Sequence, residues 1–137
     1  MEEKIFNSQD HEDYYDSEKD LIRSVWFSRA DISENLHKQE FISYFNCVRQ
    51  YKPKYIIVDT KKANREISIE TQSWIAKNYF PIYTEIGLKN LAILLSENAM
   101  LAFSILQTVE SAVKDSETWE TKYFADEKVA IEWMFGN

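Results

Sequence analysis

The chain has 137 residues, of which 45% are apolar and 28% charged, the size and composition of a single globular domain. It contains one cysteine, Cys47, which excludes an intrachain disulfide and fits a reducing compartment. The first residues are acidic, and no apolar run approaches the roughly 18 residues of a membrane span. We therefore expect a cytoplasmic protein without a signal peptide or a transmembrane segment.

The net charge of −7 is concentrated near the N-terminus. Residues 1–20 hold eight acidic residues and two lysines, whereas the rest of the chain holds 15 acidic and 14 basic residues. The body of the chain therefore lacks the basic surface that neutralises phosphates in nucleic-acid binders. We predict an acidic N-terminal segment over residues 1–10, a single domain over residues 11–137, and no nucleic-acid partner.

The scarcity of glycine excludes several enzyme classes. Gly87 and Gly136 are the only glycines, whereas a phosphate-binding loop, a dinucleotide fingerprint and a nucleophile elbow each need at least two that lie close together. The two histidines, His11 and His37, have no second His or Cys nearby, and His37 is expected on a solvated helix face, so no metal site is predicted. Cys47 is expected to be a buried, inert thiol. The sequence thus predicts no enzyme and no cofactor.

Five segments have the β-branched and aromatic residues that are typical of strands. The first two form an N-terminal hairpin whose turn is the acidic stretch 16–20. The third and fourth are short apolar runs, which indicates burial on both faces of a sheet. The five segments are 11–16, 20–28, 55–59, 90–95 and 119–124.

Four segments with helical periodicity follow the hairpin and alternate with the remaining strands. In the first, Phe41, Tyr44, Phe45 and Val48 share one face of a helix over residues 33–50. In the second, Pro81 lies inside the pattern, so we expect that helix to end or kink near it. The expected N-caps are Asp31 or Ser33, then Ser68, Ser96 and Asp126.

This alternation predicts an α/β fold with a mostly parallel sheet covered by helices. Several motifs, in this order along the chain, also resemble the STAS-like (anti-sigma-factor-antagonist-like) family, in the bacterial branch whose shape is similar to CRAL-TRIO lipid-binding domains. They are Val25-Trp26, Asp59-Thr60, Trp74, Pro81, the strand 91–94 and the ending 123–134.

The resemblance implies a mixed, mostly parallel sheet of four to five strands with an N-terminal hairpin, about four flanking helices, and no catalysis. Signalling members carry a phosphorylatable Ser or Thr in an Asp-Ser-Ser-Gly-like run after the buried strand. Here the corresponding segment, 59–68, has no such run and no glycine, which puts that phosphoswitch in doubt.

Candidate site residues cluster after the strand 55–59. Open α/β sheets bind ligands at the carboxyl ends of their strands, and the loop that follows is basic, which suits an anion near a helix N-terminus. The alternative is that Asp59 bonds its own loop and that the basic side chains are solvated. Ser68 is a candidate phosphosite, with an ordinary N-cap as its alternative. The candidate ligand-binding residues are Asp59, Thr60, Lys61, Lys62, Arg65 and Trp74.

Two functions fit these expectations. The first is a non-enzymatic binding or regulatory module that contacts another protein or a second copy of itself through the acidic segment and an exposed edge strand of the hairpin. The second is a carrier for a small apolar or anionic ligand or a lipid. A closed apolar cavity beneath the helix that carries Trp74, or a ligand that copurifies with the protein, would favour the carrier.

Overall fold

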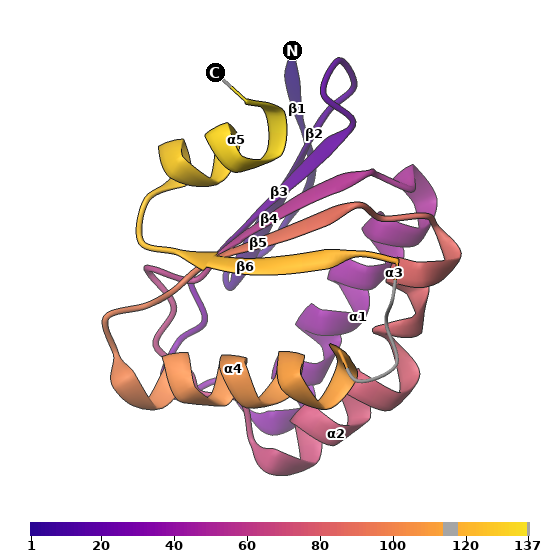
Figure 1. Ribbon diagram of the computed structural model, residues 1–137. Helices are drawn as coiled ribbons and strands as arrows, with labels where there is room; N and C mark the ends of the chain where they lie inside the picture. The colour runs from indigo at the N-terminus through magenta and orange to yellow at the C-terminus, as the bar shows by residue number, and fades with distance from the viewer. Residues whose placement is uncertain (114–117, 137) are drawn as a thin grey trace.

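The computed structural model describes residues 1–113 and 118–136, which form one six-stranded sheet with helices on both faces (Figure 1). The strands lie side by side in the order in which the chain makes them, β1 to β6. Their bounds are β1 Glu2–Asn7, β2 His11–Asp16, β3 Leu21–Trp26, β4 Tyr55–Asp59, β5 Asn90–Leu94 and β6 Glu120–Phe124.

The sheet has one strand more than the five expected, because residues 2–7 of the acidic segment form β1. This strand pairs antiparallel with β2, which pairs antiparallel with β3. The exposed edge is therefore β1, and the expectation that the first strand of the hairpin lies exposed is wrong. From β3 onward every pairing is parallel, as the alternation of strands and helices predicted.

Four helices cover one face of the sheet, and a single helix covers the other (Figure 1). The single helix is α5. Among the described residues, no helix is long and apolar enough to cross a membrane. The bounds are α1 Glu34–Tyr51, α2 Ile69–Asn78, α3 Pro81–Glu85, α4 Ala99–Val113 and α5 Glu127–Phe135.

Helix boundaries follow local chemistry. The hydroxyls of Ser33 and Ser68 accept hydrogen bonds from backbone N–H groups of α1 and α2, and Asp126 does the same for α5, as expected. The kink predicted near Pro81 is instead a break between two helices, because Pro81 begins the separate helix α3. Ser96 was the wrong choice for α4, because the Asn98 side chain accepts from the backbone N–H groups of Met100 and Leu101.

The core has two parts, one on each face of the sheet. Alternate residues of each strand point to opposite faces, so Ile56 joins the large cluster beneath the four helices and Ile57 joins the small cluster beneath α5. Both side chains are fully buried. The apolar strands are thus buried on both faces, as their composition predicted.

Candidate functional site

A partly open cavity of about 90 Å³ lies between the parallel strands and the helices α1 to α4. Its walls are almost entirely apolar, and they come from every element that packs on this face. Phe41 and Phe45 come from α1, Ile75 from α2, and Leu101 and Ile105 from α4. The cavity therefore lies where the carrier hypothesis expects it, under the helix that carries Trp74.

His37 places a polar group in this apolar wall. Its side chain lines the cavity and is only 1% exposed. Among the described residues, its Nδ1 atom has no hydrogen-bond partner. Burial and the nearby Arg65 guanidinium lower the pKa of His37 to about 4, so the imidazole is neutral at physiological pH. The expectation of a solvated His37 is wrong, because α1 turns this residue toward the sheet.

Arg65 forms part of the boundary between the cavity and the surface. Its side chain lines both the cavity and a shallow polar groove that contains Asp31, Asn64 and Asn98. The guanidinium donates to the backbone carbonyls of Ile32 and Glu66, and it forms an ion pair with Glu34 (Nη2–Oε1 3.2 Å). The groove lies at the carboxyl ends of β3, β4 and β5, where open α/β sheets bind ligands.

The structure separates the candidate residues that follow β4. Thr60 and Arg65 line the cavity, and the Thr60 hydroxyl donates to the carbonyl of Leu94 (2.7 Å). Asp59 accepts from the backbone N–H of Lys61 (3.0 Å), which is the loop hydrogen bond named as the alternative. The side chain of Lys61 is exposed, and Lys62 lies over the ring of Phe27 rather than at the cavity.

Trp74 and Ser68 lie outside the cavity wall. The Trp74 ring packs edge-on against Tyr79 with 4.9 Å between ring centroids, and the Lys38 ammonium lies over it. The Ser68 hydroxyl accepts from the N–H of Thr71, so Ser68 is the N-cap of α2. Hydrogen bonding with Ser68 also lowers the pKa of Glu34, so a carboxylate lies close to the hydroxyl of this N-cap.

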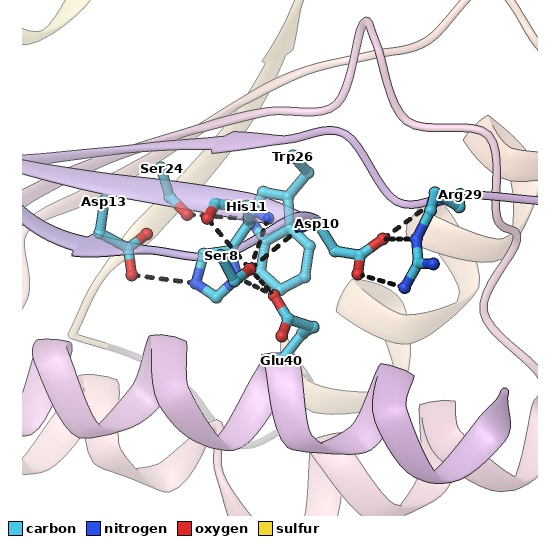
Figure 2. Close-up of polar contacts among 8 residues, drawn as sticks. All are labelled: Ser8, Asp10, His11, Asp13, Ser24, Trp26, Arg29 and Glu40. Carbon is cyan, nitrogen blue, oxygen red and sulfur yellow. Dashed lines mark hydrogen bonds and ion pairs between the residues drawn. The ribbon is translucent and has the colours of Figure 1, made fainter. Parts of the chain in front are cut away.

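A second polar feature is a buried cluster that fastens the β1–β2 hairpin to α1 (Figure 2). Its centre is His11, which is fully buried. Its Nδ1 lies 2.7 Å from Glu40 Oε1, and its Nε2 lies 3.1 Å from Asp13 Oδ2. Burial alone would lower the pKa of His11, but the two carboxylates outweigh it and raise the pKa. The ring is thereby held as an imidazolium.

The cluster is not arranged as a catalytic triad. The Ser8 hydroxyl donates to the Glu40 carboxylate (2.5 Å) and not to a ring nitrogen of His11, so this cluster lacks the serine–histidine pair of a triad. None of Ser8, His11, Asp13 and Glu40 lines the cavity. Cys47 lies close to Asp13, and burial raises its pKa to about 12, which agrees with the inert thiol that the sequence indicated.

Trp26 connects the two features. One face of its indole stacks on His11 with 4.3 Å between centroids and 8° between planes, while the same residue lines the cavity. Phe41 stacks on Trp26 at 5.0 Å and also contacts the ring of His37 at 4.8 Å. A chain of four rings thus runs from the imidazolium to the cavity.

Sequence reasoning assigned no role to His11 or His37, although both carry a signal. His37 stands one turn before Phe41 on the apolar face of α1, so it belongs to the buried stripe. His11 and Asp13 occupy alternate positions of a strand, so they share one face. In both cases the signal is a polar residue at a position that the helical or strand periodicity places toward the core.

The described residues contain no group of three or more His, Cys, Asp and Glu side chains placed to hold a metal ion. Comparison with known proteins found no matching family model, no matching curated protein and no matching solved structure. The cavity and the imidazole of His37 in its wall are therefore the observations from which a function can be argued.

Proposed function

We propose that this chain is a non-enzymatic binding module of STAS-like type that holds a small, mainly apolar ligand in its cavity. The observation that carries the proposal is the cavity of about 90 Å³ between the parallel strands and the helices, lined almost wholly by apolar side chains. Protein interiors are close-packed and contain few voids larger than a water molecule. An apolar cavity of about 150 Å³ in another protein accepts benzene or xenon.

Arg65 supports an entry route for this ligand. It lines both the cavity and the surface groove, and long side chains of this kind move more readily than the surrounding aromatic wall. Its ion pair with Glu34 is partly exposed, so breaking it costs only about 0–1 kcal/mol. A ligand could therefore enter at the edge of the sheet without unfolding a helix.

Native mass spectrometry tests the proposal directly. The mass of the purified full chain under native conditions is compared with its mass after denaturation, and the vapour above the heated sample is analysed for released small molecules. We expect an additional mass that is lost on denaturation. The same preparation of an Ala63→Leu variant, whose larger side chain fills the cavity, should carry none.

Ile69→Ala is the matched control, because Ile69 is 75% exposed and lies outside the cavity wall. It should retain the ligand as the wild type does. If the wild type carries no extra mass and also fails to take up xenon, the cavity has no binding role and the proposal fails.

A second candidate is a contact surface for another protein, which was the first expectation from the sequence. Met100 and Phe103 stand on the outer side of α4 and are 64% and 58% exposed. Exposed apolar side chains of this size are common at protein interfaces. Replacing both with serine should abolish capture of a specific partner while leaving the thermal stability of the domain unchanged.

A further inference from the structure

The imidazole of His37 lines the cavity, and no hydrogen bond joins either of its ring nitrogens to a described residue. The hydroxyls of Thr60 and Thr108 donate to the backbone carbonyls of Leu94 and Ser104. The hydroxyls of Tyr44 and Tyr83 bond to each other at 2.8 Å. Buried polar groups in folded proteins are satisfied in the great majority of cases, so an exception that lines a cavity calls for a partner inside the cavity.

The charges around the cavity favour a neutral ligand. The one guanidinium in the wall, Arg65, is already paired with Glu34 and with two backbone carbonyls. The imidazole of His37 is itself uncharged, because burial holds its pKa at about 4. A carboxylate or an ammonium group placed here would lose its hydration without gaining a free countercharge.

The volume sets the size of the ligand. A cavity of about 150 Å³ accepts benzene, which has six non-hydrogen atoms. By the same ratio a cavity of about 90 Å³ accommodates about four. A longer lipid chain would require the helices to move apart, so we commit to a free small molecule.

From these three observations we propose that the ligand is a small uncharged molecule with one hydrogen-bonding group, a hydroxyl or a carbonyl, which bonds to the imidazole of His37. This inference rests on the proposed function, because it names the chemical class of the ligand in the same cavity. A neutral imidazole has one ring nitrogen that donates and one that accepts, and the tautomer decides which is which. Both an alcohol and a ketone can therefore satisfy it.

The test uses two probes, xenon and 1-propanol, on the full-length wild type and on His37→Phe. Xenon reports whether the cavity admits an apolar guest, and 1-propanol reports whether a hydroxyl is recognised. Binding is followed by xenon-129 NMR and by the shifts of the His37 ring nitrogens on titration with the alcohol. Phenylalanine keeps a ring at position 37, and the substitution breaks no hydrogen bond of Nδ1, so the variant should fold.

We expect both probes to bind the wild type, and we expect His37→Phe to bind 1-propanol about three- to tenfold more weakly while still taking up xenon. His37→Gln, which restores a hydrogen-bonding group, should recover part of the affinity for the alcohol. Melting curves of all variants without ligand confirm that they are folded.

Other outcomes separate the two proposals. If xenon binds but 1-propanol leaves the His37 nitrogens unshifted, or binds His37→Phe equally well, the hydroxyl recognition is wrong and the apolar cavity stands. A water molecule that stays hydrogen-bonded to His37 and is not displaced by the alcohol would leave the ring nitrogens unshifted in this way. If neither probe binds the wild type, both proposals fail.

Discussion

The two histidines are buried to the same extent and yet differ in charge. His11 is 0% exposed and lies between two carboxylates, which raise its pKa. His37 is 1% exposed and lies among apolar side chains, which lower its pKa to about 4. Burial alone disfavours the charged form in both cases. The protonation state therefore depends on the partners that the fold supplies and not on depth.

The contrast also separates two roles. Both nitrogens of His11 are used inside the protein, so this residue fastens β2 to α1 and can recognise nothing else. His37 lines the cavity and leaves Nδ1 without a partner, which is unfavourable for the folded protein. Removing His11 should therefore destabilise the fold much more than removing His37.

The largest expected effect is that of His11→Ala. This change leaves Asp13 and Glu40 facing each other without the cation between them, and removing one partner from a buried charge network costs about 3–5 kcal/mol. Urea unfolding at pH 7 measures the change. His37→Phe is the control, and its free energy of unfolding should fall by less than about 1 kcal/mol. An equal fall in both variants would show that His11 and His37 contribute alike to stability.

The pH dependence of stability should show opposite signs for the two residues. The folded pKa of His11 is raised above 6.5, so its contribution is complete below pH 6.5 and declines as the pH rises through the folded value. The folded pKa of His37 is about 4, so between pH 6.5 and pH 4 this histidine binds a proton in the unfolded chain but not in the folded protein. His37 therefore destabilises the fold as the pH falls, by up to about 3 kcal/mol.

Unfolding of the wild type and of His37→Phe at pH 7.5 and pH 4.5 isolates this second effect. The carboxylates Asp10 and Glu40, whose pKa values are also lowered, titrate in both proteins and cancel in the comparison. We expect the variant to lose less stability on acidification. Parallel pH profiles for the two proteins would show that His37 is protonated in the fold near pH 6.5.

A smaller effect compares the packing on the two faces of the sheet. Ala63 lines the cavity, whereas Ala92 is fully buried in the small cluster beneath α5. Ala92→Val should cost about 1–3 kcal/mol through overpacking. Ala63→Val should be neutral or stabilise by about 1 kcal/mol, because its methyl groups enter the void. Thermal melts of the pair measure both changes, and similar losses would mean that the cavity has no room for added atoms.

The smallest effect concerns the surroundings of His37. Glu34→Gln removes the carboxylate that pairs with Arg65, and this partly exposed ion pair contributes only about 0–1 kcal/mol. The pKa of His37 should nevertheless fall further, because Glu34 raises it and Arg65 lowers it. NMR titration of the His37 ring checks the direction, and a rise would show that the Glu34 carboxylate does not raise the pKa of His37.

Much of the fold could be predicted from local patterns. The helical spacing of Phe41, Tyr44, Phe45 and Val48 located α1, and the apolar run at residues 55–59 located β4. Both signals are strong. The helical spacing reflects burial of one face of a helix, and the apolar run reflects burial of both faces of a strand. Strand β1 was missed because Glu2, Glu3 and Lys4 are charged and Ile5-Phe6 is too short an apolar run to predict a strand. It becomes a strand by pairing with β2.

The site was harder to predict for a physical reason. Arg65 and Thr60 were found because the carboxyl ends of parallel strands are a general place for ligands. The cavity depends on how side chains from α1, α2 and α4 fail to fill the space over the sheet, which no local pattern encodes. The burial of His37 was readable from its helix face, but the absence of a partner for Nδ1 required the packed structure.

The agreement between strand order and chain order has a consequence for synthesis on the ribosome. Each strand of the sheet pairs with the strand made just before it, so no strand must wait for a distant partner. We expect the sheet to grow from β1 toward β6 as the chain emerges, with the hairpin and its His11 cluster as the first nucleus. Of the helices that line the cavity, α4 is made last, so the cavity stays open until that helix arrives. A ligand of the proposed kind would then be enclosed during translation instead of entering the finished fold.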